Sequence, residues 1–195
     1  MRPDTSADVD HLRETAVSRR EVYRGRLLHV FEDEVRLPDG RPARREVVEH
    51  PGAVAVVALD DDGRAVLVRQ WRHAVGGAIW EIPAGTREPE EPPERTAARE
   101  LAEETGYRAR HWRLLGCAGV SPGYSRELIW FFAARGLTPG ETGADADEQL
   151  DVALMGAAEI AELVGGGRVD AKTLAGLAMA GLLPRIDGEP VEAAL

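Results

Sequence analysis

A cluster of carboxylates lies near the middle of the chain, in the segment Arg-Glu-Leu-Ala-Glu-Glu-Thr-Gly at positions 99–106. An α-helix turns about 100° per residue, so Glu103 and Glu104 would lie about 60° and 40° from Glu100, on one face. Like charges at this spacing destabilise a helix by roughly a few tenths of a kcal/mol per pair. A divalent cation such as Mg²⁺, which prefers carboxylate oxygens, would offset that repulsion. The alternative interpretation is a solvated charged face without a ligand.

A fixed frame of further residues surrounds the three carboxylates. Gly85 stands six residues before Glu91, Glu91 eight before Arg99, and Gly106 two after Glu104. The resulting pattern is G-x5-E-x7-R-E-L-x-E-E-x-G. Seven polar or glycine positions, each drawn at roughly 5–10% frequency, coincide by chance on the order of once in a hundred million windows or less often. The frame therefore favours the metal interpretation over the solvated face.

The stretch 85–107 resembles the Nudix box, the signature of hydrolases that cleave a nucleoside diphosphate linked to another group. The resemblance implies that Glu100 and Glu104 are metal ligands and that Glu103 contributes as a ligand and as a catalytic residue. It implies that the backbone carbonyl of Ala84 is a further ligand. The implied cofactor is Mg²⁺ or Mn²⁺.

The remaining box residues are expected to support this site. The resemblance gives Glu91 and Arg99 a structural role, as an ion pair that orients the loop against the helix. We expect Gly85 to need a backbone conformation that only glycine adopts readily. We expect Gly106 to end the helix.

The general base is expected outside the box. In the ADP-ribose diphosphatase branch of the family it tends to be a glutamate on a late loop, and the acidic segment 145–152 falls where that loop belongs. The resemblance therefore makes Glu148 the candidate base. The alternative is a flexible acidic loop without a catalytic role.

Two further motifs resemble the ADP-ribose branch. Segment 121–125 reads Ser-Pro-Gly-Tyr-Ser, and segment 69–73 reads Arg-Gln-Trp-Arg-His before Glu-Ile-Pro-Ala-Gly at 81–85. The guanidinium of Arg72 is the leading candidate for substrate binding, because a guanidinium can bind phosphate through two hydrogen bonds. The other candidate substrate contacts are Arg45, Arg69, Pro122 and Tyr124. For each arginine taken alone, a surface salt bridge is the alternative.

The pattern of apolar residues and turns predicts the elements that position these side chains. Apolar and β-branched runs predict strands at 22–37, 43–50, 53–59, 64–70, 78–83, 112–120, 128–134 and 151–155. Helices are expected at 92–105, 157–164 and 170–183. This order predicts an α+β protein. It agrees with the Nudix fold, an α/β/α sandwich with a mixed sheet, here preceded by an N-terminal antiparallel β-hairpin extension.

The sequence divides into four expected segments. These are a flexible N-terminus (1–20), the β extension (21–50), the Nudix hydrolase domain (51–185) and a C-terminal tail (186–195). In the ADP-ribose branch the extension forms a small sheet that exchanges with a partner subunit and completes the substrate site. The resemblance therefore implies a homodimer.

Composition limits the classes of function. The 195 residues carry a formal net charge of −10, which argues against nucleic-acid or anionic-membrane binding as the main role. The sequence has no apolar run long enough to span a membrane, and its first twenty residues lack an apolar secretory segment. One cysteine excludes an intrachain disulfide and fits the cytoplasm.

The expected activity is metal-dependent hydrolysis of ADP-ribose by an activated water, giving AMP and ribose 5-phosphate. The alternative substrates are another nucleoside diphosphate sugar, such as GDP-mannose, or a dinucleotide. A non-catalytic nucleotide sensor is the alternative from a different class. The intact box and the short sequence that follows Val164 weigh against a sensor with an added DNA-binding domain.

Overall fold

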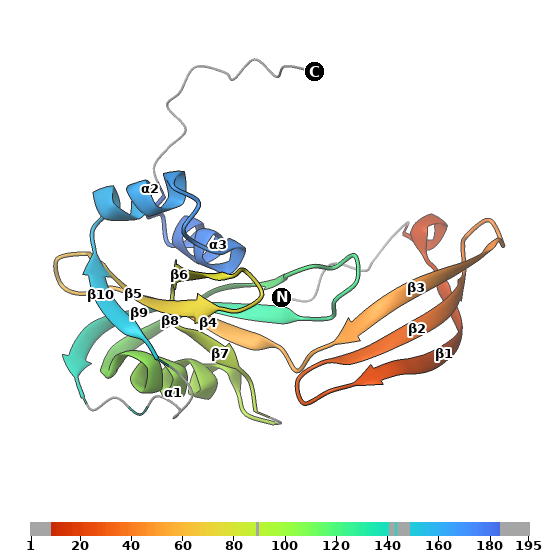
Figure 1. Ribbon diagram of the computed structural model, residues 1–195, viewed down its shortest axis with the longest axis horizontal. Helices are drawn as coiled ribbons and strands as arrows, with labels where there is room; N and C mark the ends of the chain where they lie inside the picture. The colour runs from red at the N-terminus through yellow and green to blue at the C-terminus, as the bar shows by residue number, and fades with distance from the viewer. Residues whose placement is uncertain (1–8, 89, 141–142, 144–148, 184–195) are drawn as a thin grey trace, which may run out of the picture.

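The computed structural model of the chain describes residues 9–88, 90–140, 143 and 149–183. Figure 1 shows two parts, a body in which sheets lie between helices and an N-terminal sheet that projects from one end of it. No helix in these described ranges is both long and apolar enough to cross a membrane.

Two sheets form the centre of the body, with the strand orders β7-β4-β9-β8 and β10-β5-β6. The strands are β4 (Ala53–Ala58), β5 (Ala65–Arg72), β6 (Gly77–Glu81), β7 (Ala84–Thr86), β8 (Tyr107–Gly119), β9 (Leu128–Pro139) and β10 (Asp151–Met155). Strands β4 and β9 run parallel, whereas the other neighbouring pairs are antiparallel. The predicted mixed sheet is therefore present.

Helices cover both sides of these sheets. Helix α1 (Pro93–Thr105) lies on one side, and α2 (Ala157–Gly165) and α3 (Ala171–Met179) lie on the other (Figure 1). Proline stands at the start of α1, where a missing N–H leaves no hydrogen bond unmade. Gly106 ends α1 in the left-handed conformation, with a φ of 71°.

Strand β4 joins the two apolar cores because all its side chains are buried. Successive side chains of a strand point to opposite faces. Val54 and Val56 accordingly pack in the core that contains Leu101 of α1. Val57 packs in the core that contains Leu177 of α3. The α/β/α arrangement predicted from the sequence is confirmed.

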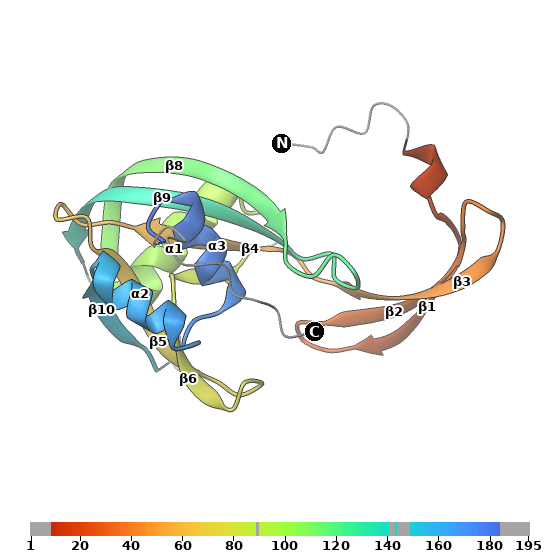
Figure 2. The same ribbon diagram turned by 90° about the horizontal axis from the view of Figure 1, so that it is seen from above.

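The N-terminal sheet contains β1 (Thr15–Arg24), β2 (His29–Arg36) and β3 (Pro42–Glu49), paired in that order and antiparallel. Figure 2 shows the sheet extending away from the body, with β3 leading back towards β4. Every residue of β1 is exposed. A short 3₁₀ helix, η1 (Asp10–Leu12), precedes it.

The extension differs from its prediction in two details. The expected single strand 22–37 is wrong, because a turn at 25–28 divides it between β1 and β2, with the Gly25 N–H donating to the Leu28 carbonyl at 2.8 Å. Strand β1 also begins at Thr15, inside the segment expected to be flexible. An exposed strand lacks the apolar alternation that reveals a strand in a sequence.

Candidate active site

A cavity of about 850 Å³ lies where β5, β6, β7, α1 and the start of α3 meet. Its lining includes the four predicted metal ligands, Ala84, Glu100, Glu103 and Glu104, and one of the five predicted substrate contacts, Arg72 from β5. Gly85 and Arg99, which were predicted to support the site, also line it. The fold therefore gathers one acidic wall, on α1, and one wall that carries Arg72.

The carboxylates of α1 differ in their exposure to this cavity. Glu104 is buried, and its Oε2 accepts the backbone N–H of Ala84 at 3.0 Å. The side chain of Glu100 is 13% exposed, whereas that of Glu103 is 40% exposed. The helix thus places two carboxylates deep in the site, beside strand β7, which carries the Ala84 carbonyl, and one nearer to solvent.

Gly85 is required for a reason that differs from the predicted one. Its backbone has no positive φ, so the expectation of a glycine-only conformation is wrong. Instead, a Cβ atom added at Gly85 would lie 2.0 Å from the carboxyl carbon of Glu100. The missing side chain makes room for the carboxylate, because any larger residue would push Glu100 away from β7.

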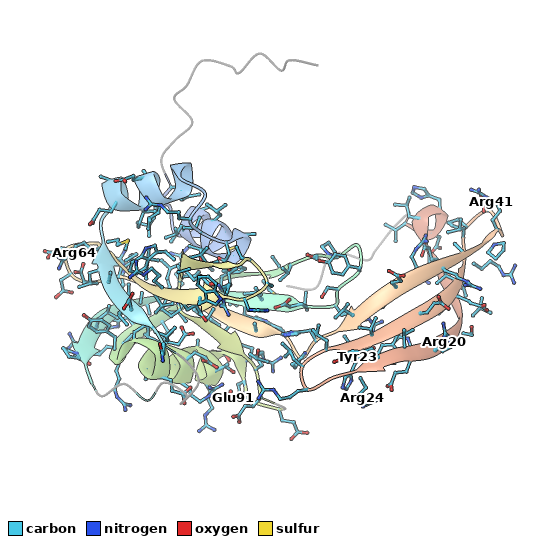
Figure 3. All side chains as sticks on the ribbon, viewed as in Figure 1. Arg20, Tyr23, Arg24, Arg41, Arg64 and Glu91 are labelled. Atoms are coloured by element: carbon cyan, nitrogen blue, oxygen red, sulfur yellow. The ribbon has the colours of Figure 1, made fainter. Side chains whose placement is uncertain are left out.

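Arg99 connects the acidic wall to the loop before α1. Its Nη1 lies 2.8 Å from Glu100 Oε1 and 2.8 Å from Glu103 Oε2, and its Nη2 lies 3.1 Å from Glu91 Oε2. The Arg99 guanidinium holds the pKa of Glu91 below its ordinary value, although burial alone would raise it. Glu91 stands at the edge of the body beside α1 in Figure 3.

The donor set suits a hard divalent cation, since it offers the carboxylate oxygens of α1 and the Ala84 carbonyl within one cavity. In the described part of the chain, no three His, Cys, Asp or Glu side chains already converge as a metal cage. Arg99 instead occupies oxygens of Glu100 and Glu103. The space that Gly85 leaves for Glu100 is the structural feature that fits a bound cation, because it brings a carboxylate against the backbone of β7.

The opposite wall contains a chain of alternating charges that the sequence did not predict. Arg72 donates to Glu81 through Nε at 2.5 Å and Nη2 at 2.6 Å. Lys172, from α3, donates to Glu81 Oε2 and to Asp170 Oδ2, the latter at 2.6 Å. Burial alone would raise the pKa of Asp170, but the charge and hydrogen bond of Lys172, together with hydrogen bonds from Thr173, lower that pKa overall. All four side chains line the cavity.

Sequence reasoning missed Glu81 and Lys172 as members of the site. Glu81 belongs to the Glu-Ile-Pro-Ala-Gly motif, where it received no role. Lys172 lies 91 residues away, and only the packing of α3 beside β6 brings the two together. One signal was available, since Lys172 is the only lysine in the sequence.

Two of the predicted substrate arginines do not line this cavity. Arg45, on β3, donates through Nε to Glu14 at 3.0 Å. Arg69, on β5, donates through Nε to Asp151 at 2.9 Å. Because Arg69 and Arg72 are an odd number of residues apart on one strand, they point to opposite faces. Substrate contacts from Arg45 and Arg69 stay predictions.

The other predicted contacts come from loops. Pro122 and Tyr124 lie between β8 and β9 and outside the cavity lining, and the Tyr124 carbonyl accepts the N–H of Val48 at 2.7 Å. This loop therefore joins the body to β3. Glu148, the predicted base, lies outside the described residues.

Comparison with known proteins identifies the family. A model of the NUDIX domain matches residues 49–175, and a model of the nucleoside diphosphate sugar hydrolase N-terminal domain matches residues 14–48. The chain therefore belongs to the Nudix family and is a Nudix hydrolase. Enzymes of this family generally need a divalent metal.

Three individual relatives show which proteins the chain resembles in sequence. An ADP-ribose pyrophosphatase of Bacillus subtilis (strain 168) is 39% identical over 144 residues, covering 74% of this chain and 78% of the relative. A methanol dehydrogenase activator of Bacillus methanolicus is 38% identical over 164 residues, covering 83% and 89%. An ADP-ribose pyrophosphatase of Mycobacterium tuberculosis (strain ATCC 25618 / H37Rv) is 44% identical over 122 residues, covering 62% and 59%.

A solved structure supports the fold. The crystal structure of an ADP compounds hydrolase aligns with a TM-score of 0.78 at 23% identity. The alignment covers 87% of this chain and 94% of that one. The predicted Nudix fold is confirmed.

Proposed function

We propose that this hydrolase cleaves the diphosphate bond of ADP-ribose, with Mg²⁺ or Mn²⁺ as cofactor, and releases AMP and ribose 5-phosphate. The observation that carries the proposal is one cavity with the acidic face of α1 on one wall and Arg72 on another. The ADP-ribose pyrophosphatases among the relatives, at 39% and 44% identity, support the choice of substrate.

The acidic wall would hold the cation through Glu100, Glu103, Glu104 and the Ala84 carbonyl. When bound, a divalent cation neutralises phosphate oxygens and lowers the pKa of a water molecule, which then serves as the nucleophile. Arg99 bonds to Glu100 and Glu103 and offsets part of their charge. A cation would therefore compete with Arg99 for these oxygens.

Arg72 would bind the diphosphate. Its Nε and Nη2 are engaged by Glu81, and its Nη1 makes no hydrogen bond to any described residue. The side chain is 41% exposed and lines the cavity. A fixed guanidinium with one nitrogen available suits an anionic oxygen, because charge-assisted hydrogen bonds are roughly twice as strong as neutral ones.

Glu148 is our proposed general base, with Glu103 as a second group that contacts the attacking water. Glu103 is the most exposed of the three carboxylates on α1 whose side chains line the cavity, which favours contact with water. We expect Glu148→Gln to lower turnover clearly while metal affinity, measured by calorimetry, stays near that of the wild type. An unchanged rate would place the base elsewhere.

We further propose a homodimer assembled through the N-terminal sheet. Each apolar side chain in the set Val17, Val22, Tyr23 and Leu27 is more than half exposed in the single chain, which a partner surface would cover. Figure 3 shows Tyr23 on the N-terminal sheet, nearer to the body than Arg20 and Arg41. Arg26, in the turn after β1, lines the cavity and thereby links the extension to the site. Light scattering showing only a 21.1 kDa species at micromolar protein would contradict the dimer.

A substrate panel tests the proposed activity. ADP-ribose, GDP-mannose and NADH are compared at equal concentration with Mg²⁺, and the released monophosphates are quantified by chromatography. We expect the highest kcat/KM for ADP-ribose. Much faster cleavage of GDP-mannose would overturn the substrate assignment, and nucleotide binding without cleavage of any of the three would favour a sensor.

A further inference from the structure

The chain has one lysine, Lys172, and it lies in the wall of the cavity. All 24 lysine and arginine residues are arginine except Lys172. The two side chains differ, because the lysine ammonium is a compact charge and the arginine guanidinium is a broad planar fork. A position where this arginine-rich chain has lysine is therefore a candidate for a contact that requires the smaller group.

The surroundings of Lys172 match that requirement. Its ammonium lies between two carboxylates, in contact with Glu81 Oε2 and 2.6 Å from Asp170 Oδ2. The lysine side chain is 13% exposed and that of Glu81 is 1% exposed. The compact ammonium therefore pairs with both carboxylates at once.

Lys172 and Arg72 share the buried carboxylate of Glu81. A buried carboxylate is costly unless its oxygens are paired and hydrogen-bonded. Oε1 accepts the Arg72 Nε at 2.5 Å, and Oε2 accepts the Arg72 Nη2 at 2.6 Å together with the ammonium of Lys172. Because both oxygens are engaged, Glu81 binds the edge of the guanidinium that carries Nε and Nη2. The remaining nitrogen, Nη1, faces away from Glu81.

Backbone contacts fix the position of Lys172 relative to Glu81. Asp170 caps α3, with Oδ1 accepting the Thr173 N–H at 2.9 Å. The hydroxyl of Thr173 accepts the N–H of Ile82, the residue after Glu81, at 3.0 Å. These hydrogen bonds attach the start of α3 to the end of β6. Lys172 is therefore held in a fixed position relative to Glu81 and is not a mobile surface group.

We propose that Lys172 is a positioning residue for substrate binding, acting through Glu81 to hold Arg72 with its Nη1 towards the diphosphate. The inference rests on the proposed function, because it assumes that Arg72 binds the substrate. Without the ammonium, Asp170 loses its cationic partner and keeps only the Thr173 N–H. Two neighbouring carboxylates, Asp170 and Glu81, then compete for the one guanidinium. Arg72 then turns towards the wall and presents less of its charge to the cavity.

The test is a double-mutant cycle on Lys172 and Arg72, since such cycles separate dependent from independent effects. The variants are Lys172→Met, Arg72→Ala and the pair combined, each assayed with ADP-ribose and Mg²⁺. We expect Lys172→Met to raise KM about tenfold or more and to keep kcat within about threefold. In the Arg72→Ala background the same change has an effect of less than about twofold, because its target is gone.

A matched control and a second readout separate positioning from folding. Arg168→Met removes a cation from the same segment, but one that is 54% exposed and pairs with Glu162, so KM stays near that of the wild type. Calorimetry of ADP-ribose binding in EDTA measures affinity without turnover and is expected to follow the KM changes. If Lys172→Met does not fold, Lys172→Gln replaces it in the cycle.

The outcomes are distinct. Independent effects of the two substitutions, which multiply in the double variant, would overturn the proposal, as would a wild-type KM in Lys172→Met. If the wild type cleaves GDP-mannose and not ADP-ribose, the proposed function fails, and the same cycle run with GDP-mannose still tests Lys172.

Discussion

The body and the N-terminal sheet are stabilised in different ways. In the body, β4 is buried on both faces, and apolar side chains such as Val56 and Leu67 have no exposed surface. In the sheet, β1 is exposed along its whole length. Its contacts with β2 include ion pairs, among them Arg19 with Asp33 at 2.7 Å and Arg20 with Glu32 at 3.1 Å.

The two regions therefore differ in how far each can be stable by itself. Burial of apolar surface is the dominant favourable term in folding, and exposed ion pairs contribute about 0–1 kcal/mol each. The body therefore has the means to fold around its own cores. The sheet lacks a comparable core within one chain, which fits a part that becomes covered in an assembly.

The largest expected effect concerns chemistry in the body. Glu100→Gln and Glu104→Gln should each lower kcat at least about a hundredfold, because each removes the negative charge and one oxygen of a carboxylate proposed to hold the cation. The control is Glu94→Gln, a change on the exposed part of the same helix, which should leave kcat near that of the wild type. Near wild-type turnover in both site variants would refute the metal assignment.

The second prediction contrasts the packing of the two regions. Leu101 is fully buried, so Leu101→Ala should lower the free energy of unfolding by about 2–5 kcal/mol. Val17, on β1, is 57% exposed, so Val17→Ala should change it by less than about 0.5 kcal/mol in the dissociated chain. Urea denaturation at low protein concentration measures both. Equal losses would mean that the sheet has a core of its own.

The third prediction tests whether the exposed strand is an interface. Val22 on β1 is 55% exposed, and Val22→Asp would place a charge on the surface that the proposed dimer covers. We expect the proposed dimer to dissociate at micromolar concentration in analytical ultracentrifugation while the melting of the body changes little. A dimer that persists unchanged would locate the interface elsewhere.

The smallest expected effect concerns the stability of the N-terminal sheet at acidic pH. The hydrogen bond from Arg19 lowers the pKa of Asp33 below its ordinary value of 3.8. The pair therefore stabilises the sheet fully above about that pH, and the contribution is lost as the pH falls through the lower folded-state value. The protection of β2 amide hydrogens, measured as the ratio of intrinsic to observed exchange rate, should fall in that acidic window. In Asp33→Asn the loss of protection attributable to this pair should be absent, and its persistence would show that other groups dominate.

Prediction from the sequence worked best where chemistry fixes residue spacing. The box gave α1, its end at Gly106 and the set of carboxylates that line the cavity, because helical geometry alone determines which side chains share a face. The reason for Gly85 was missed, since the approach of Glu100 is a tertiary contact. Glu81 and Lys172 were missed for the same reason. Strand β1 escaped detection because an exposed strand carries no apolar alternation.

Phosphorus-31 NMR of the wild-type protein with ADP-ribose is a direct test of whether the protein cleaves this substrate and needs a divalent metal to do so. With Mg²⁺, the diphosphate resonances should disappear as those of AMP and ribose 5-phosphate grow in equal amounts. With EDTA in place of Mg²⁺, the spectrum should stay unchanged. Intact ADP-ribose in the presence of Mg²⁺ or Mn²⁺, or equal cleavage in EDTA, would contradict a metal-dependent ADP-ribose hydrolase built on the carboxylates of α1.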